Sequence, residues 1–321
     1  MTRYFVTGGF GFLGQYIVQA LLDEDPQAQV IVLGRSARRT FLGVETSPRV
    51  RWIQAGLSQP QAYLPALQQA DAVIHAAALV SFRRSDAQAV YQANVLGTRA
   101  LSEAAMQAGV QNFIFISSIS AIGTSLQGAS DETHYPDEDD KRRHDMYGYS
   151  KLISERELYE VRAKLRVITL NPSVILGPGS ARINTVLRQT RYLPILPVPV
   201  YVNSFVDARD VARAVVLALH QGRSGERYIV TTENVDMLSF TRQVVQTAGR
   251  QVRVVPLPAG CFLPLDGALA VLDALRLNPG IRRISEMSVD KRFSNQKIQA
   301  EMGWQPRISL PQSLRDTVGR D

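Results

Sequence analysis

Near the middle of the 321-residue chain, Tyr147 and Lys151 stand four positions apart in a segment with helical character. That spacing places both side chains on one face of a helix. A nearby ammonium favours the phenolate and lowers the pKa of a tyrosine, which can then act as general acid or base on a carbonyl or hydroxyl oxygen. The same spacing also occurs in ordinary exposed pairs, so its meaning depends on the elements around it.

A glycine-rich turn follows the first apolar run. Residues 7–14 satisfy two spacings, G-x-x-G-x-x-G and G-x-G-x-x-G. Such glycines permit a tight turn and let the backbone approach a pyrophosphate, which the N-terminus of the next helix then binds. A glycine turn can be merely structural, but between a first strand and an amphipathic helix it predicts a dinucleotide site. We assign this site to Thr7, Gly8, Gly9, Phe10, Gly11, Phe12, Leu13 and Gly14.

The residues after the second apolar run bear on which dinucleotide binds. A carboxylate about 20 residues beyond the glycines would bind the ribose 2′-hydroxyl of NAD. Here that position is Gly34, and it is followed by Arg35, Ser36, Arg38 and Arg39 without an acid. Arginines can bind a 2′-phosphate through charge-assisted hydrogen bonds, although exposed arginines are common in so arginine-rich a chain. We therefore predict NADP(H) in preference to NAD(H).

Composition excludes several classes of protein. Lysine and arginine number 36 against 29 acids, a net charge of +7, but the charges are scattered and do not indicate a nucleic-acid stripe. The single Cys261 excludes an intrachain disulfide and a cysteine-based zinc site, and four scattered histidines predict no metal. The longest apolar stretch, 256–277, is interrupted by Asp266, Asp273 and prolines. We expect a cytoplasmic protein with a small-molecule substrate, no signal peptide and no membrane-spanning segment.

Alternating short apolar runs and helical patterns predict an α/β fold, a Rossmann-type doubly wound parallel sheet with a smaller, mostly C-terminal, α+β substrate-binding domain. We expect the first domain to comprise residues 1–175 and about 201–232, and the second about 176–200 and 233–321. The acidic-then-basic stretch Asp131–Asp145 is expected to be a solvated loop, or alternatively a substrate lid. The expected strands are Tyr4–Thr7, Val30–Leu33, Val50–Gln54, Ala72–His75, Phe113–Ser117, Val167–Leu170 and Arg227–Val230, and the clearest helices are Leu13–Leu22, Val90–Ala108, one from near Tyr147, Asp210–Leu219 and Leu238–Ala248.

Two further segments complete a pattern, Ser117-Ser118 at the end of the fifth strand and Asn94 on the preceding helix. Together with the glycine turn, Tyr147 and Lys151, they make the chain resemble an extended short-chain dehydrogenase/reductase nearly end to end. The resemblance implies that Tyr147 moves the proton, and that Lys151 lowers its pKa and binds the nicotinamide ribose. It also implies that Ser118 hydrogen-bonds the reacting oxygen and that Asn94 supports a proton-relay water.

The resemblance implies contacts beyond these four residues. Cofactor contacts are implied at Leu57, Ala76, Ala77, Ala78, Lys151, Pro172, Ser173 and Val174. Substrate contacts are implied at Ser81, Phe82, Ser118, Ile119, Tyr147 and Tyr192. The family also implies a homodimer formed through two helices, with Leu101–Met106 and Leu152–Leu158 as candidate surfaces.

Two segments bear on the branch of the family. Residues 192–200 are apolar, where sugar-nucleotide enzymes carry a glycine turn with an arginine, and 282–289 lack their Gly-Asp pair. The chain therefore looks closest to 3β-hydroxysteroid dehydrogenases and dihydroflavonol reductases, acting on a carbonyl or alcohol of a largely apolar substrate. Residues 192–200 could also be a buried structural turn, and Arg282 with Arg283 could still hold a diphosphate. A nucleotide-sugar epimerase or dehydratase with tightly bound NAD, and a non-catalytic NADP(H)-sensing module, remain as alternatives.

Overall fold

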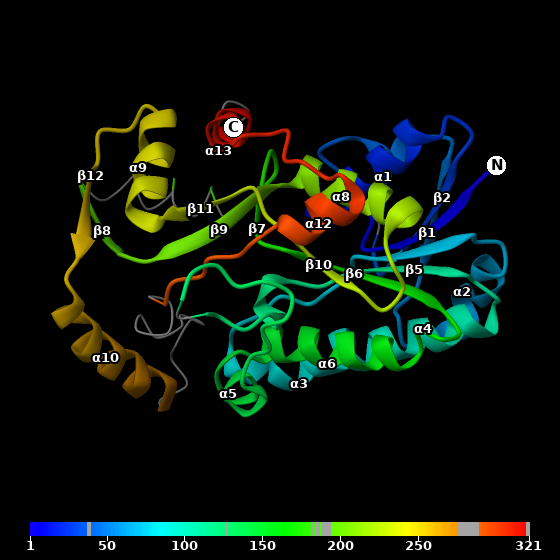
Figure 1. Cartoon of the computed structure of the whole chain (residues 1–321), viewed down its shortest axis with the longest axis horizontal. Helices are drawn as coiled ribbons and strands as arrows, with labels where there is room; N and C mark the ends of the chain where they lie inside the picture. Colours follow the sequence, from blue (N-terminus) through cyan, green and yellow to red (C-terminus); the bar gives the residue numbers. More distant parts are fainter. Residues whose placement is uncertain are drawn as a thin grey trace.

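The computed structural model describes residues 1–36, 40–125, 127–180, 183, 187, 194–274 and 289–318. A central sheet of seven parallel strands has the order β10-β6-β5-β4-β1-β2-β3 (Figure 1). This order reverses beside β1, as in a doubly wound Rossmann-type sheet, and confirms the predicted fold class. The strands are β1 Arg3–Thr7, β2 Gln29–Gly34, β3 Val50–Gln54, β4 Ala72–His75, β5 Asn112–Ile116, β6 Arg166–Pro172 and β10 Arg227–Val230.

Alternating apolar side chains give the sheet two buried faces. In β1, Tyr4 and Val6 pack into one hydrophobic cluster, whereas Phe5 packs into the other, because successive residues of a strand point to opposite faces. The first cluster is completed by α1 Phe12–Glu24, α8 Ala208–Gln221 and α12 Gln296–Met302. The second is completed by α2 Pro60–Leu67, α4 Gly97–Gln107 and α6 Met146–Glu160, below the sheet in Figure 1.

The long helix predicted over Val90–Ala108 is present but is divided. It begins as α3 Ala87–Tyr91, passes through a π-helical turn, η3 Gln92–Leu96, and continues as α4. Single π turns inside α-helices are frequent at functional sites. Short 3₁₀ turns lie in the loops around the large sheet, η1 Val44–Thr46, η2 Arg84–Asp86 and η4 Ile119–Ala121, and η5 Ala259–Cys261 lies further along the chain, directly before residue 262.

Two smaller sheets lie at the end of the molecule opposite the N-terminus (Figure 1). One joins β11 Glu233–Asp236, β9 Val202–Asp207 and β7 Val174–Leu176, and the other joins β12 Arg253–Leu257 and β8 Ile195–Pro199. The helices of this end are α9 Met237–Thr247, α10 Phe262–Ala274 and α13 Leu310–Val318. The residue limits of two domains remain a prediction.

Two sequence interpretations were wrong. Residues 194–200 are not a buried turn: β8 pairs in parallel with β12, and its alternation leaves Ile195 51% exposed while Leu196 and Val198 are buried. The stretch 131–145 is not entirely a solvated loop, because α5 Glu138–His144 forms within it. The Asp137 side chain caps α5, and acids in its first turn and bases in its last turn complement the helix dipole.

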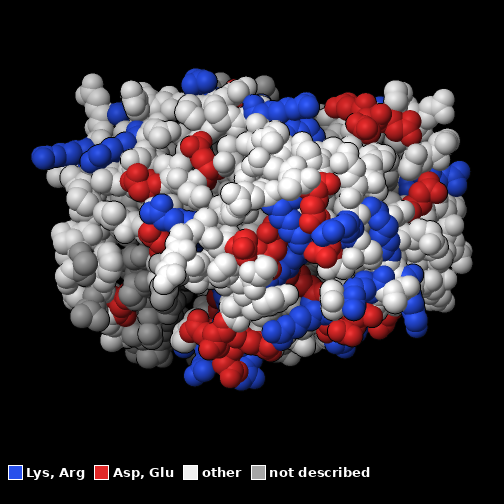
Figure 2. All heavy atoms as spheres, viewed as in Figure 1, with Lys and Arg blue, Asp and Glu red and all other residues white. Residues whose placement is uncertain are grey.

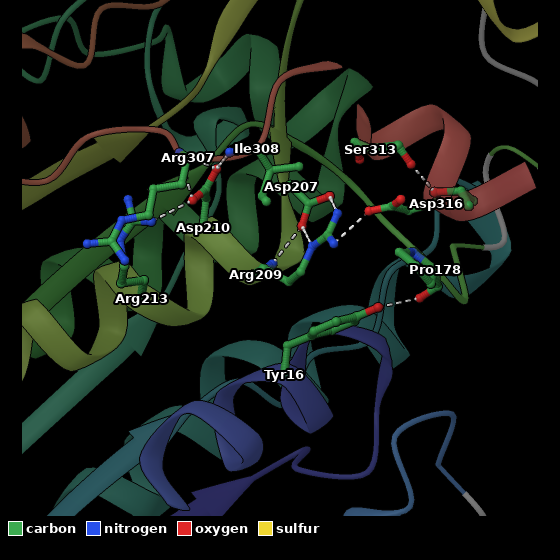
Figure 3. A network of polar contacts seen from close by, with 11 residues as sticks. Tyr16, Pro178, Asp207, Arg209, Asp210, Arg213, Arg307, Ile308, Ser313 and Asp316 are labelled. Carbon is green, nitrogen blue, oxygen red and sulfur yellow. Dashed lines mark hydrogen bonds and ion pairs between the residues drawn. The ribbon is translucent and has the colours of Figure 1, made fainter. Parts of the chain in front are cut away.

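The C-terminal segment is tied to the start of α8 (Figure 3). The buried carboxylate of Asp210 accepts the backbone N–H groups of Arg307 and Ile308, at 3.1 and 2.9 Å. Arg209 bridges Asp207, which caps α8, and Asp316 on α13. The buried carboxylates of Asp207 and Asp210 therefore fix the position of the C-terminal segment from Arg307 to Asp316.

Within the described part of the chain, no helix combines the length and the apolar character needed to cross a membrane. In those same residues, no group of three or more metal-ligating side chains gathers. On the face drawn in Figure 2, lysine and arginine side chains are interspersed with acidic ones. The absence of a nucleic-acid partner stays a prediction.

Candidate active site

The glycine turn lies between β1 and α1 and meets the loop after β4. Gly8 has φ +71°, and a Cβ there would lie 2.8 Å from the backbone nitrogen of Ala77. At Gly14 a Cβ would lie 2.0 Å from the carbonyl oxygen of Gly8, so only glycine lets α1 begin this close to the turn. The predicted residues Thr7–Gly14 and Ala76–Ala78 are thereby brought together.

The start of α1 suits a pyrophosphate. Gly11 is the N-cap residue, and among the described residues no side chain caps this helix end. Uncapped N–H groups and the positive end of the helix dipole favour a phosphate anion there. At the end of β6, two buried atoms, Asn171 Oδ1 and Ser173 Oγ, have no hydrogen-bond partner within the described residues. Both features fit a polar cofactor along the carboxyl edge of the sheet, as predicted for Pro172, Ser173 and Val174.

The exposed end of β2 carries Arg35 and Ser36. The Gln54 amide at the end of β3 donates to the Arg35 carbonyl oxygen at 3.2 Å, which fixes that backbone and leaves the Arg35 side chain in solvent. Arg38 and Arg39, predicted to share its role, lie outside the described residues. Leu57 follows β3 and packs on α4, where a Cβ on Gly97 would approach it to 2.9 Å.

His75 joins three elements around the turn. The Thr98 hydroxyl donates to the Asn94 carbonyl, so Thr98 Oγ1 accepts from His75 Nε2 at 2.8 Å. Thr7 Oγ1 accepts from the Ala77 N–H and donates to His75 Nδ1 at 2.6 Å. Burial lowers the pKa of His75 to about 3. The neutral imidazole therefore satisfies one fixed hydrogen-bond chain from β1 to α4 and is not placed to exchange protons with solvent.

Tyr147 and Lys151 lie in the first two turns of α6, which Asp145 caps. Lys151 is only 2% exposed; its Nζ donates to the Ile116 carbonyl at 2.7 Å and lies 4.5 Å from the centroid of the Phe115 ring. Burial lowers the pKa of Lys151 to about 7. Lys151 is therefore not half of an ordinary exposed pair on the helix surface, which was the alternative interpretation of its spacing from Tyr147.

Ser118 lies two residues beyond Ile116 and begins η4. Its Oγ accepts the Ser120 N–H at 3.1 Å. Gly148 allows α6 to approach this turn, because a Cβ there would lie 2.8 Å from the Ser120 carbonyl oxygen. The structure thus brings the end of β5, which carries Ser118, against the start of α6, which carries Tyr147.

Asn94 lies in the π-helical turn η3, on the helix where it was predicted. Its amide nitrogen donates to the Leu79 carbonyl at 3.0 Å and to Ser150 Oγ at 2.9 Å, and its Oδ1 accepts the Leu79 N–H at 2.7 Å. The side chain therefore holds the loop after β4 against α6. Its support of a relay water remains a prediction.

Of the residues predicted to contact the substrate, Phe82 lies beside Tyr147, whereas the side chains of Ser81 and Ile119 contact other residues. Phe82 is 41% exposed, and its ring stands edge-on to that of Tyr147, with 6.0 Å between centroids. Ser81 Oγ donates to Asp86 at 2.6 Å, and Ile119 is buried with Ile122. Tyr192 lies outside the described residues, as do Arg282 and Arg283.

The proposed dimer surfaces need correction in part. Leu101, Leu152 and Leu158 are buried within this chain, so they do not offer a surface to a second copy. The homodimer itself remains a prediction.

Sequence reasoning missed Glu155, a buried carboxylate one turn beyond Lys151 on α6. Ser117 donates to it, Asn171 Nδ2 donates to its Oε1 at 2.6 Å, and Arg227 lies 3.3 Å from its Oε2. The spacing of four from Lys151 is a signal that could have found it, since both residues share one helical face.

Comparison with known proteins identifies the family of the chain. The profile of the NAD dependent epimerase/dehydratase family matches residues 4–231. A putative dihydroflavonol 4-reductase from Synechocystis sp. is 28% identical and covers 98% of this chain and 93% of its own. Sterol demethylase protein B from Methylococcus capsulatus is 33% identical, covering 71% of this chain and 69% of its own. Among solved structures, that of gox2253 has a TM-score of 0.85 at 27% identity and covers 99% of this chain and 97% of its own.

Proposed function

Because the chain belongs to the NAD-dependent epimerase/dehydratase family of extended short-chain dehydrogenases/reductases, we propose that it transfers hydride between NADP(H) and a carbonyl or alcohol carbon of a largely apolar small molecule, with Tyr147 as general acid/base. Membership makes the protein an NAD(P)-dependent oxidoreductase that acts on CH–OH or C=O groups. The choice of NADP(H), the class of substrate and the roles of individual residues are the proposal.

One observation carries the proposal: a buried Lys151 lies one helical turn beyond Tyr147 and is anchored to the strand end that leads to Ser118. An ammonium held in this way stabilises the phenolate of Tyr147 by its charge, which lowers the cost of proton release. Ser118 supplies a hydroxyl at the same strand end. The three residue types needed for acid/base work on an oxygen therefore converge where ligands bind in open α/β sheets.

In the reducing direction, bound NADPH supplies hydride to the carbonyl carbon. The oxygen that gains negative charge accepts the Tyr147 proton, and the resulting phenolate is stabilised by Lys151 and reprotonated from solvent. Ser118 donates a hydrogen bond to the same oxygen, where charge develops. In the oxidising direction the phenolate would remove the hydroxyl proton, and the hydride would pass from the carbon to bound NADP⁺.

NADP(H) is favoured by the charge at the end of β2. Gly34 replaces the acid that would bind a ribose hydroxyl, and Arg35 follows it in an exposed position. A guanidinium binds a phosphate through charge-assisted hydrogen bonds, which a carboxylate at the same place would oppose.

An apolar substrate is favoured by the surroundings of Tyr147. The ring of Phe82 lies beside it, and Ile119 follows Ser118 directly. Of the two relatives, one is named for a dihydroflavonol and the other for a sterol, and neither name refers to a sugar nucleotide. Hydrophobic walls with a few polar groups at the reacting oxygen are the usual form of such sites.

The test is oxidation of NADPH, followed at its absorbance band, against a panel of cyclic and aromatic ketones, with NADH as the matched control. We expect turnover with NADPH on apolar ketones and at least ten-fold lower kcat/KM with NADH, about 1.4 kcal/mol or more. Copurified NAD together with conversion of a UDP- or dTDP-sugar and no net cofactor consumption would instead establish the sugar-nucleotide branch. Binding of NADPH without turnover of any compound class would indicate a sensing module.

A further inference from the structure

A buried carboxylate and guanidinium lie behind the Tyr147 and Lys151 pair. We propose that Glu155, held as a carboxylate by its ion pair with Arg227, is a positioning residue that keeps Lys151 protonated and fixes the residues that follow β5, including Ser118. The inference rests on the proposed function, since it concerns the same proton-transfer group, but it is tested by a measurement that requires no turnover.

The polar network of Glu155 holds three consecutive residues at the end of β5. Lys151 Nζ binds the carbonyl of Ile116, and the hydroxyl of Ser117 donates to Glu155. Asn171 Nδ2 donates both to Glu155 Oε1, at 2.6 Å, and to the Ser118 carbonyl, at 3.0 Å. Glu155 therefore fixes residue 117 directly and residue 118 through Asn171, while Lys151 on the same helix fixes residue 116.

The charges around Lys151 come from a small set of elements. On its own helix are Glu155 and Tyr147, and β4 contributes His75, which burial keeps neutral. β5 presents the Phe115 ring and the Ile116 carbonyl, neither of which carries a charge, and β10 contributes Arg227, which pairs with Glu155. Within the described residues, Glu155 is thus the negative charge that opposes the desolvation of the lysine.

The directions of the pKa shifts agree with this geometry. Burial lowers the pKa of Lys151, and the charge of Glu155 raises it. Burial raises the pKa of Glu155, and the charge of Arg227 together with hydrogen bonds from Ser117 and Asn171 opposes that rise. The geometry favours the carboxylate form, because Arg227 lies 3.3 Å from Oε2 and both donors point to Oε1. A neutral lysine would leave the Tyr147 phenolate without its counter-charge, so the ionisation of Glu155 bears on the acid/base step.

Arg227 does not depend on Glu155 for its place. Its Nε donates to the Glu132 carbonyl at 2.8 Å, its Nη2 to the His134 carbonyl at 3.2 Å, and its guanidinium stacks on the Tyr135 ring at 4.1 Å. In a Glu155→Gln variant, Arg227 therefore keeps three partners. The amide oxygen of the new glutamine can still accept from Ser117 and Asn171. We expect this variant to fold.

The experiment follows the titration of Lys151 by NMR. The chain has five lysines, Lys141, Lys151, Lys164, Lys291 and Lys297, so ¹³Cε-lysine labelling gives few signals, and Lys151→Met assigns the one of interest. In Glu155→Gln we expect the Lys151 titration to move about one pH unit lower, because a negative charge one helical turn away is removed. In Glu155→Asp, which keeps the charge, we expect a smaller displacement than in Glu155→Gln.

Glu132→Gln is the matched control. Glu132 is also a buried carboxylate, but its Oε1 accepts the Ile229 N–H rather than contacting β5 or α6. We expect the Lys151 titration in this variant to match that of the unaltered protein. An unmoved titration in Glu155→Gln, or a displacement in Glu155→Asp as large as that in Glu155→Gln, would overturn the role of the charge.

A kinetic measurement then separates the two proposals. Where a substrate is in hand, Glu155→Gln should lower kcat about ten-fold with little change in the KM for NADPH, and the pH profile should move with the lysine. A shifted titration in a protein that turns over no carbonyl compound would uphold the effect of Glu155 on Lys151 and refute the proposed function. An unshifted titration in an active reductase would uphold the proposed function and refute the effect of Glu155 on Lys151.

Discussion

Lys151 illustrates a cost of the proposed site, because a buried ammonium destabilises the fold. Burial lowers the pKa of Lys151 from the ordinary lysine value of 10.5 to about 7. This corresponds to a cost of at most about 5 kcal/mol in the free energy of unfolding. Lys151→Met removes this cost with a side chain of similar size. It also loses the hydrogen bond to the Ile116 carbonyl, about 1 kcal/mol, whereas the attraction to Glu155 is already contained in the net pKa of about 7. We therefore expect the variant to be about 2–4 kcal/mol more stable at about pH 6.5, and inactive.

The dependence on pH follows from the direction of the shift. Below the folded-state pKa, the buried lysine is charged and its cost is fully present. As the pH rises from about 7 towards 10.5, the folded state releases the proton while the unfolded state retains it, so the unaltered protein gains stability from this group. The advantage of Lys151→Met should therefore shrink between about pH 6.5 and about pH 9.5.

Urea unfolding at both pH values measures this difference, with thermal melting as a second probe. Lys164→Met, at an exposed lysine, serves as the control and should change stability by less than about 0.5 kcal/mol at either pH. A Lys151→Met variant that is less stable at the lower pH, or whose advantage is the same at both, would show that the buried ammonium does not destabilise the fold.

Three further predictions follow from other parts of the molecule. Arg35→Ser should raise the KM for NADPH about ten-fold or more and leave that for NADH nearly unchanged, measured by initial rates, because only NADPH carries the 2′-phosphate. Gly14→Ala should destabilise the fold by about 1–3 kcal/mol in urea and weaken NADPH binding measured by fluorescence, because its Cβ would lie 2.0 Å from the Gly8 carbonyl oxygen. Asp210→Asn should cost about 3 kcal/mol in the same unfolding assay, because the buried carboxylate that accepts two backbone N–H groups is replaced by an amide that can present a donor to them.

The sequence allowed the sheet and the glycine turn to be predicted, because both depend on local pattern. Apolar runs such as Val30–Leu33 fall within observed strands, and Gly8, Gly11 and Gly14 lie where the turn needs them. The pairing of Tyr147 with Lys151 was visible as a spacing, but the burial of the lysine was not, because it depends on the Phe115 ring and the Ile116 carbonyl of another element.

What the sequence left hidden was mostly long-range or depended on context. Glu155 and Arg227 are 72 positions apart and meet only because β10 pairs with β6 beside α6. The helix α5 was missed because its acids and bases suggest a solvated loop unless their order along the helix dipole is considered. Residues 194–200 were open to a turn interpretation because their parallel partner, β12, lies more than 50 positions further along the chain.

The most direct test of the account is the rate of NADPH-dependent ketone reduction by Tyr147→Phe, with Tyr149→Phe as control on the same helix. We expect Tyr147→Phe to bind NADPH within about two-fold of the unaltered protein, by fluorescence titration, and to lose at least about 100-fold in kcat. Tyr149→Phe should retain most of its activity, because Tyr149 lacks the four-residue spacing to Lys151. Unchanged turnover in Tyr147→Phe would contradict the assignment of this tyrosine as the group that moves the proton.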